Sequence, residues 1–320
     1  MRNKTKKTVL IVACVALCLG LLTSCVGLSA LGFDFKKLDT SKMQTREYEA
    51  VEEFTAISVD VRTADLTLLP AQDNKTKVVC VEEEKTPHSV LVKDGVLTIE
   101  VEDNRKWYDH IGVYFESQKI TMYLPKSEYA KITVEMDTGD ICVAKEFSFA
   151  QAKITTHTGD VVWSAGVSEI LEIETNTGDI EVGSVVCEAK LALKSDTGDM
   201  EIFDITCKAL SIETDTGDVE LGNSTTGELS IKTDTGDVGL ENVVANALNV
   251  ETNTGDVDLR DSDAGTIKIV TDTGDVCGVL LSEKIFFTDT NTGKVDVPKT
   301  TSGGVCDVRT KTGDIKFSIK

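Results

Sequence analysis

Acidic side chains recur at a fixed step along most of this 320-residue chain, where an aspartate follows a glycine every 19 or 20 residues. A row of carboxylates suits Ca²⁺, which takes about six to eight oxygen ligands. We therefore predict a calcium site; the alternative is that these aspartates accept backbone hydrogen bonds in a turn and face solvent. One copy carries Lys294 instead, which we expect to interrupt the row. The candidate ligands are Asp179, Asp199, Asp218, Asp237, Asp256 and Asp275.

Two cysteines share one position in consecutive repeats, because Cys187 and Cys207 each lie nine residues after their glycine. Stacked strands would place their Cα atoms about 4.8 Å apart, which is within the range of a disulfide. We expect this pair to form a disulfide if the compartment is oxidising. No Cys-x-x-Cys spacing indicates a zinc site.

Sequence signals of catalysis are absent. The three histidines do not form His-Glu-x-x-His, and the sequence has neither Gly-x-Ser-x-Gly nor a phosphate-binding glycine loop. A catalytic pair of carboxylates needs two different environments, which near-identical repeats do not provide. We predict that the protein is not an enzyme and needs no cofactor beyond the calcium considered above.

The repeated turn indicates the fold that positions these residues. Apolar and polar residues alternate on both sides of each glycine, which is typical of half-buried strands. We predict an all-β fold, a β-solenoid of about ten coils with 19–20 residues in each, in which every coil completes its core against the next. A meander of tandem hairpins is the alternative. The turn glycines are Gly139, Gly159, Gly178, Gly198, Gly217, Gly236, Gly255, Gly274, Gly293 and Gly313.

The N-terminal segment has the pattern of a membrane-targeting leader. Residues 1–7 carry four basic side chains, and residues 8–33 carry no charge. Leu22-Thr23-Ser24-Cys25 resembles the lipobox of bacterial lipoproteins, in which Cys25 would be lipidated; a single transmembrane helix or a cleaved secretion signal are the alternatives. We expect a leader or anchor at 1–33, a stalk at 34–53, a β-rich N-terminal cap at 54–130 and the solenoid at 131–320.

The chain is strongly acidic, with a net charge of −21 that becomes −25 without the four basic leader residues. Such a charge disfavours binding to nucleic acid and to anionic headgroups. The partners that it favours are cations, cationic peptides or basic protein surfaces. Alternatively, the acidic residues only keep a long β-array soluble.

The Thr-x-Thr-Gly-Asp-Val units, together with Phe54–Val61 and Met122–Tyr129, resemble a bacterial β-strand-repeat family described as putative adhesins, a domain of unknown function. The resemblance covers about residues 45–320. It implies a surface protein anchored in the cell envelope on the extracytoplasmic face, an adhesin or interaction scaffold for envelope proteins or glycans. Some relatives are tied to envelope stress, which implies an alternative role as a sensor that sequesters cationic antimicrobial peptides or Ca²⁺. No catalytic or binding residue can be carried over from the family.

Overall fold

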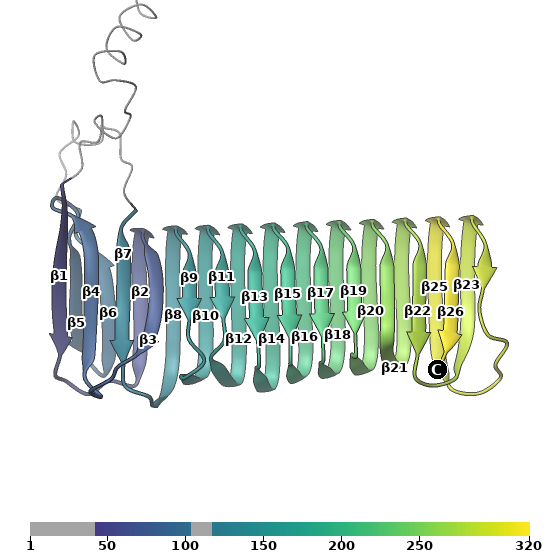
Figure 1. Ribbon diagram of the computed structural model, residues 1–320, viewed down its shortest axis with the longest axis horizontal. Helices are drawn as coiled ribbons and strands as arrows, with labels where there is room; N and C mark the ends of the chain where they lie inside the picture. The colour runs from purple at the N-terminus through teal and green to yellow at the C-terminus, as the bar shows by residue number, and fades with distance from the viewer. Residues whose placement is uncertain (1–41, 104–116) are drawn as a thin grey trace, which may run out of the picture.

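The computed structural model describes residues 42–103 and 117–320, and this part of the chain is all β, with no helix. None of its segments is therefore a helix long and apolar enough to cross a membrane. The strands stack side by side into one elongated body with the N-terminal strands at one end (Figure 1). The leader, including Cys25, lies outside the described residues.

Two parallel sheets form the body. Eleven strands belong to the long-strand sheet: β2 (Ala56–Thr63), β6 (Val96–Val101), β8 (Glu128–Thr138), β10 (Ser148–Thr158), β12 (Gly166–Thr177), β14 (Val186–Thr197), β16 (Thr206–Thr216), β18 (Thr225–Thr235), β20 (Val244–Thr254), β23 (Lys284–Thr292) and β25 (Gly304–Thr312).

The opposite face is the short-strand sheet. Its parallel strands are β3 (Asp65–Pro70), β7 (Lys119–Leu124), β9 (Ile141–Val143), β11 (Val161–Trp163), β13 (Ile180–Gly183), β15 (Met200–Phe203), β17 (Val219–Gly222), β19 (Val238–Glu241), β22 (Val276–Leu280), β24 (Val295–Asp296) and β26 (Ile315–Ile319). One continuous strand, β21 (Val257–Thr273), contributes to both sheets.

Strands of the same kind pair in parallel with equivalent residues opposite each other. Leu210 of β16, for example, lies between Leu191 of β14 and Leu229 of β18. Parallel pairing between successive repeats confirms the predicted β-solenoid and shows that the hairpin meander was wrong. All three leucines are at most 2% exposed. Burying such a side chain contributes about 1.5–3 kcal/mol, so the aliphatic columns are the main stabilising feature.

The glycine turn requires glycine for two physical reasons. Gly236 has a φ of +155°, and every repeat glycine except Gly293 has a φ between +137° and +156°, which disfavours any residue with a Cβ. A Cβ on Gly236 would also lie 2.0 Å from the carbonyl oxygen of Gly217 in the neighbouring coil. Gly236 N–H donates to the carbonyl of Thr254 at 2.9 Å, which links this turn to the coil on its other side.

Buried threonines join the coils at the same turn. The hydroxyl of Thr233 is almost fully buried and donates to the carbonyl of Gly217 at 3.4 Å. The equivalent bond recurs from Thr175, Thr214, Thr252, Thr271, Thr290 and Thr310. These hydroxyls therefore link each coil to the glycine carbonyl of its neighbour.

The second turn has the same left-handed conformation in five consecutive coils. Non-glycine residues with φ between +49° and +61° begin it: Ser184, Asp204, Asn223, Asn242 and Asp261. Asn and Asp tolerate this left-handed region better than most residues, because their short polar side chains can bond locally. The polar residues at these positions therefore belong to the turn.

The N-terminal end is closed by antiparallel strands. The parallel strands β2 and β3 lie next to β8 and β9, and β6 and β7 add one more coil outside them. Beyond that coil, β4 (Thr76–Glu83) pairs antiparallel with β7 and with β1 (Met43–Ala50), and β5 (His88–Lys93) pairs antiparallel with β6. Residues 43–50, which we expected in a stalk, thus form a strand. Part of the expected cap at 54–130 continues the solenoid.

The C-terminal end departs from sequence order. Strand β25 pairs with β21 on one side and with β23 on the other, and β26 lies between β22 and β24 in the same way. The coil formed by β25 and β26 therefore lies between β21 and β22 on one side and β23 and β24 on the other (Figure 1). The outermost coil, β23 and β24, leaves Phe287 and Val295 about half exposed.

Candidate functional site

The predicted calcium ligands form a row in which each carboxylate bonds to the next coil. The backbone N–H of Asp237 donates to Oδ1 of Asp218 at 2.7 Å, and the same bond links the successive aspartates from Asp140 to Asp275 and then Asp314. The row ends at Lys294, whose N–H donates to Asp314. Our expectation that Lys294 interrupts the row was wrong, because its coil is the outermost one.

All these aspartates are exposed, and the bond to the backbone engages one oxygen of each. The row therefore has the geometry of the alternative interpretation, in which the aspartates accept backbone hydrogen bonds at the turn. Calcium binding through the remaining oxygens stays a prediction.

The two cysteines predicted to pair lie opposite each other. Cys187 of β14 is the register partner of Cys207 of β16, and both are buried free thiols in the structure. The Cys187 thiol donates to the carbonyl of Glu169 at 2.7 Å. Burial, together with the neighbouring Cys187, raises the pKa of Cys207 to about 11, so its thiol is neutral at physiological pH. The disulfide stays a prediction about oxidising conditions.

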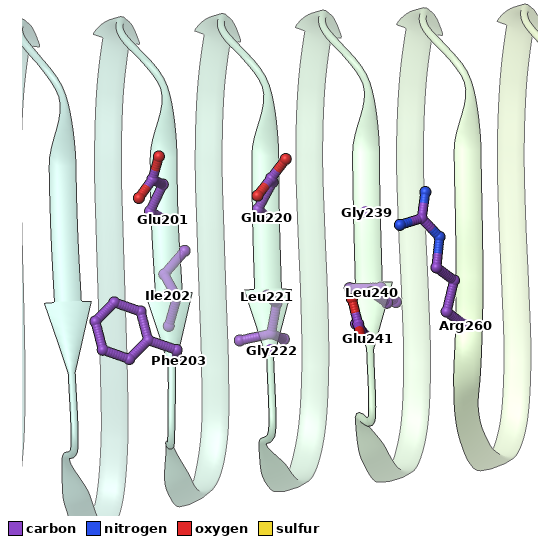
Figure 2. Close-up of a pocket in the computed structure, with 10 residues that line it drawn as sticks. All are labelled: Glu201, Ile202, Phe203, Glu220, Leu221, Gly222, Gly239, Leu240, Glu241 and Arg260. Carbon is purple, nitrogen blue, oxygen red and sulfur yellow. The ribbon is translucent and has the colours of Figure 1, made fainter.

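A groove that the sequence analysis missed lies on the outer face of the short-strand sheet (Figure 2). It crosses β15, β17, β19 and the start of β21 and has a volume of about 230 Å³. Buried Ile202, Leu221 and Leu240 lie at its base. The outward residues around it are Glu201, Phe203, Glu220, Gly222, Gly239, Glu241 and Arg260.

Two glycines create the groove. Gly222 lies between Phe203 and Glu241 in the register of the sheet, and a Cβ on Gly222 would meet no atom within 4 Å. The ring of Phe203 is turned away from Gly222 (Figure 2). It packs over Gly183 of the preceding strand, so it borders the groove and leaves the floor uncovered. Gly239 provides similar open space beside Glu220. The groove is therefore an open surface with an aromatic edge.

Charged groups line the remaining sides. Glu201 and Glu220 are register partners on one side, and Arg260 lies opposite Glu241 on another. Arg260 donates from Nε to Asp258 at 2.8 Å, and this bond raises the pKa of the guanidinium. The site thus offers carboxylate acceptors and guanidinium donors around an apolar floor. Glycines at outward strand positions were the signal that could have revealed it.

The chain is similar to several proteins of known structure. A putative adhesin from Bacteroides fragilis is 20% identical, with 87% of this chain and 97% of that chain covered and a TM-score of 0.37. A putative lipid binding protein from Parabacteroides distasonis is 13% identical, with 88% and 98% covered and a TM-score of 0.35. A putative adhesin from Parabacteroides merdae is also 13% identical, with 88% and 98% covered and a TM-score of 0.37. No curated protein matches. The family described as Toastrack DUF4097 matches residues 54–238 and 208–320, and the chain therefore belongs to this family.

Proposed function

We propose that the protein is a non-enzymatic surface interaction protein of the bacterial envelope, an adhesin-type scaffold that binds a glycan through the groove on its short-strand sheet. The observation that carries the proposal is an aromatic wall beside a glycine floor, with Phe203 and Gly222 in register on neighbouring strands. Convergent polar groups around an apolar surface are the usual composition of a binding site.

The size of the groove favours one unit of a polymer. Its volume of about 230 Å³ is below the roughly 300–1,000 Å³ of pockets that enclose a drug-sized ligand. A sugar ring has an apolar face that packs on Phe203, and its hydroxyls donate to Glu220 and accept from Arg260. One weakly bound unit gains avidity when many copies of the protein bind the same polymer.

The carboxylates around the groove support a binding role. Glu201 and Glu220 occupy equivalent register positions and are both exposed. General acid–base catalysis by two carboxylates needs environments that separate their proton affinities, and equivalent exposed positions do not supply them.

The test compares the wild-type chain with two variants on a panel of immobilised glycans. Gly222→Leu places a side chain in open space and fills the groove, whereas Ser230→Leu adds the same side chain on the exposed face of the long-strand sheet. We expect Gly222→Leu to lower binding at least about tenfold and Ser230→Leu to leave it unchanged. Equal binding by Gly222→Leu, or no glycan bound by the wild type, would refute the proposal.

We further propose that residues 1–33 anchor the protein in the membrane, with the rest of the chain on the extracytoplasmic face. The basic start followed by 26 uncharged residues supports an anchor, and Cys25 is the lipidation site under the lipoprotein alternative. Metabolic labelling with a palmitate analogue should mark the wild type and not Cys25→Ala. If neither protein is labelled but both remain in the membrane fraction, the anchor is a transmembrane helix.

A second function, capture of cationic peptides or Ca²⁺, is favoured by the exposed aspartate row and the net charge of −21. Electrostatic capture should weaken strongly between low and physiological salt, because exposed charges are screened. Binding of calcium to the folded state alone would stabilise it by about 2.7 kcal/mol at a hundredfold excess over Kd. A thermal midpoint that is identical with calcium and with chelator would exclude the calcium part.

A further inference from the structure

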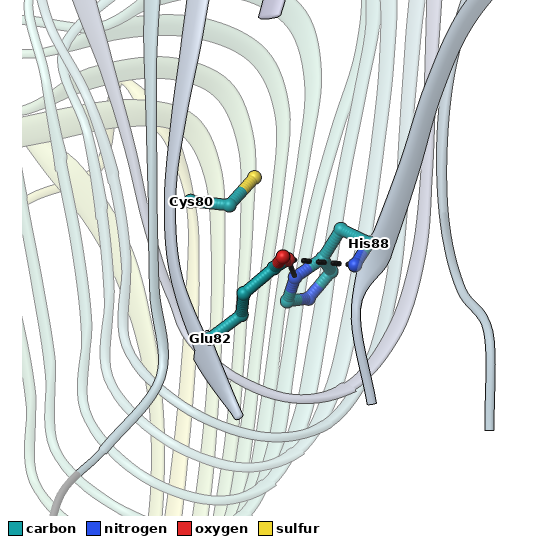
Figure 3. Close-up of side chains that lie close together, drawn as sticks. All are labelled: Cys80, Glu82 and His88. Atoms are coloured by element: carbon teal, nitrogen blue, oxygen red, sulfur yellow. Dashed lines mark hydrogen bonds and ion pairs between the residues drawn. The ribbon is translucent and has the colours of Figure 1, made fainter. Parts of the chain in front are cut away.

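Three side chains that can bind metal lie together inside the N-terminal end of the solenoid (Figure 3). Cys80 and Glu82 lie two residues apart on the inward face of β4, and His88 is the first residue of β5. One ligand atom of each lies within 4.8 Å of the others, and all three residues are buried. Among the described residues, this is the one such group of His, Cys, Asp and Glu.

Part of the bonding capacity of this group is unused. Glu82 Oε2 accepts from the backbone N–H of His88 at 2.7 Å and bonds to His88 Nδ1 at 2.8 Å. Glu82 Oε1 has only an ion pair with Arg46 Nε at 3.3 Å, and neither Oε1 nor His88 Nε2 has a hydrogen-bond partner in the described part of the chain. The side chains of Glu82 and His88 are both 0% exposed.

Other unpartnered polar atoms lie at the same end of the solenoid. Gln44 Nε2 on β1 and Gln118 Oε1 next to β7 are buried without a partner. Four of the five buried side-chain atoms without a partner in the described residues therefore lie in this cap, and Thr226 provides the fifth. Unsatisfied buried polar groups are costly, so their concentration here is itself a sign of a polar ligand.

We propose that Cys80, Glu82 and His88 bind one Zn²⁺ ion. Thiolate, carboxylate and imidazole are the three ligand types that zinc takes in proteins, and a thiolate disfavours Ca²⁺ and Mg²⁺. Two ligands of a tetrahedral zinc are about 3.3 Å apart at the usual bond lengths. One ligand atom of each of the three side chains already lies within 4.8 Å of the others, so only a small adjustment is needed. A water molecule would complete the four-coordinate shell.

Charge and proton balance are consistent with this site. Burial and the charge of Glu82 raise the pKa of Cys80 to about 12, so the thiol is neutral in the metal-free cap. Zinc would displace the thiol proton of Cys80 to solvent, and His88 would bind through one ring nitrogen as the neutral imidazole, which is the form that binds metal ions. The thiolate and the carboxylate together would balance the two positive charges of the ion. The side chain of Arg46, which forms the ion pair with Glu82, is about half exposed, so this side of the group is near solvent.

The ion would join the two sheets. Strand β4 belongs to the short-strand sheet and β5 pairs with β6 of the long-strand sheet. A bond from Cys80 and Glu82 to His88 therefore crosses the core at the end where the solenoid is closed. Solenoids need capping units to protect their terminal cores, and metal binding to a folded site adds directly to folding stability.

Cobalt substitution provides the test. The purified full-length chain in mild detergent, kept reduced, is titrated with Co²⁺ and then with Zn²⁺. We expect a near-ultraviolet thiolate-to-cobalt charge-transfer band that saturates at one ion per chain and that Zn²⁺ removes. Because a thiol that binds a metal ion must lose its proton, the affinity should rise with pH. Exposed aspartates give no such band.

Matched variants show which cysteine gives rise to the charge-transfer band. Cys80→Ser should abolish it, whereas Cys306→Ser, at a buried cysteine with a similarly raised pKa at the other end, should retain it. Glu82→Gln should weaken binding at least about 100-fold, more than the usual loss of an outer-shell partner. Far-ultraviolet circular dichroism without metal checks that each variant is folded. A wild-type chain without the band, or an equal band in Cys80→Ser, would overturn the proposal.

Discussion

A single methyl group at the glycine turn provides the sharpest test of the solenoid. In Gly236→Ala the new Cβ would lie 2.0 Å from the carbonyl oxygen of Gly217, and real Cβ contacts are essentially never shorter than 3.0 Å. The two coils must therefore separate by about 1 Å at this turn, because the contact is between backbones that no side-chain rotation can relieve.

The energetic cost follows from the bonds at the same turn. Alanine at a φ of +155° costs about 1–2 kcal/mol. A separation of 1 Å also breaks the bonds from Gly217 N–H to Thr235 and from Val219 N–H to Asp237, which are 3.0 and 2.9 Å long. At about 0.5–1.5 kcal/mol for each bond, the total is about 2–5 kcal/mol. For a domain of this size, the thermal midpoint should fall by about 4–9 °C.

Gly239→Ala is the matched control, three residues along the same coil. Its Cβ would have Glu220 Cγ at 4.0 Å as its nearest neighbour, and its φ is not positive. Here alanine should be neutral or stabilise by about 0.4–1 kcal/mol, because it lowers the entropy of the unfolded chain. Thermal unfolding followed by circular dichroism measures both variants. Equal midpoints for Gly236→Ala and Gly239→Ala would refute the proposed close contact between coils.

Other expected effects concern the side-chain hydrogen bonds between coils and the buried thiols. Thr233→Val should cost about 1 kcal/mol in chemical unfolding, because the Gly217 carbonyl loses a buried donor. Asp218→Asn keeps the acceptor for Asp237 N–H and removes one charge from the row. It should raise the thermal midpoint at low salt, because repulsion falls, and this gain should disappear at high salt. Asp218→Ala removes the acceptor and should lower the midpoint at both salt concentrations. Burial raises the pKa of Cys207 in the folded protein to about 11. The neutral thiol should therefore contribute fully to the free energy of unfolding below about pH 9, and this contribution should be lost as the pH rises through about 11. In a pH series, Cys207→Ala should reduce that alkaline loss of stability. Mass spectrometry of chain purified under oxidising conditions should show a Cys187–Cys207 disulfide; two free thiols there would contradict the pairing.

The repeat could be predicted because its rules are local. A glycine with alternating flanks specifies a turn between two strands, and the fixed period aligns the same residues in every coil. The direction of the hydrogen bond from Asp237 to Asp218 could not be predicted, because it joins residues 19 positions apart and depends on how two turns stack.

The groove and the cap cluster depend on relations that no local pattern encodes. Phe203 and Gly222 lie at one outward position in consecutive coils, where the repeats impose no residue type because the side chain faces solvent. Cys80 and Glu82 show the alternation of a strand, but their approach to His88 depends on an antiparallel cap outside the repeat. The histidine therefore had no sequence spacing that indicated a partner.

The inverted order of the last two coils has a physical basis in their core positions. Five residues before the repeat glycine, the inserted coil carries Val308, which is fully buried, whereas the outermost coil carries the polar Thr288, which is only partly buried. The outermost coil also places Phe286, which is only partly buried, opposite the fully buried Cys306. In an interior coil the hydroxyl of Thr288 would be buried without a hydrogen-bond partner, which is costly. The coil with the less apolar core residues therefore lies at the end of the stack, where its core positions are partly exposed. The composition of each coil's core positions, and not its place in the sequence, thus decides which coil ends the solenoid.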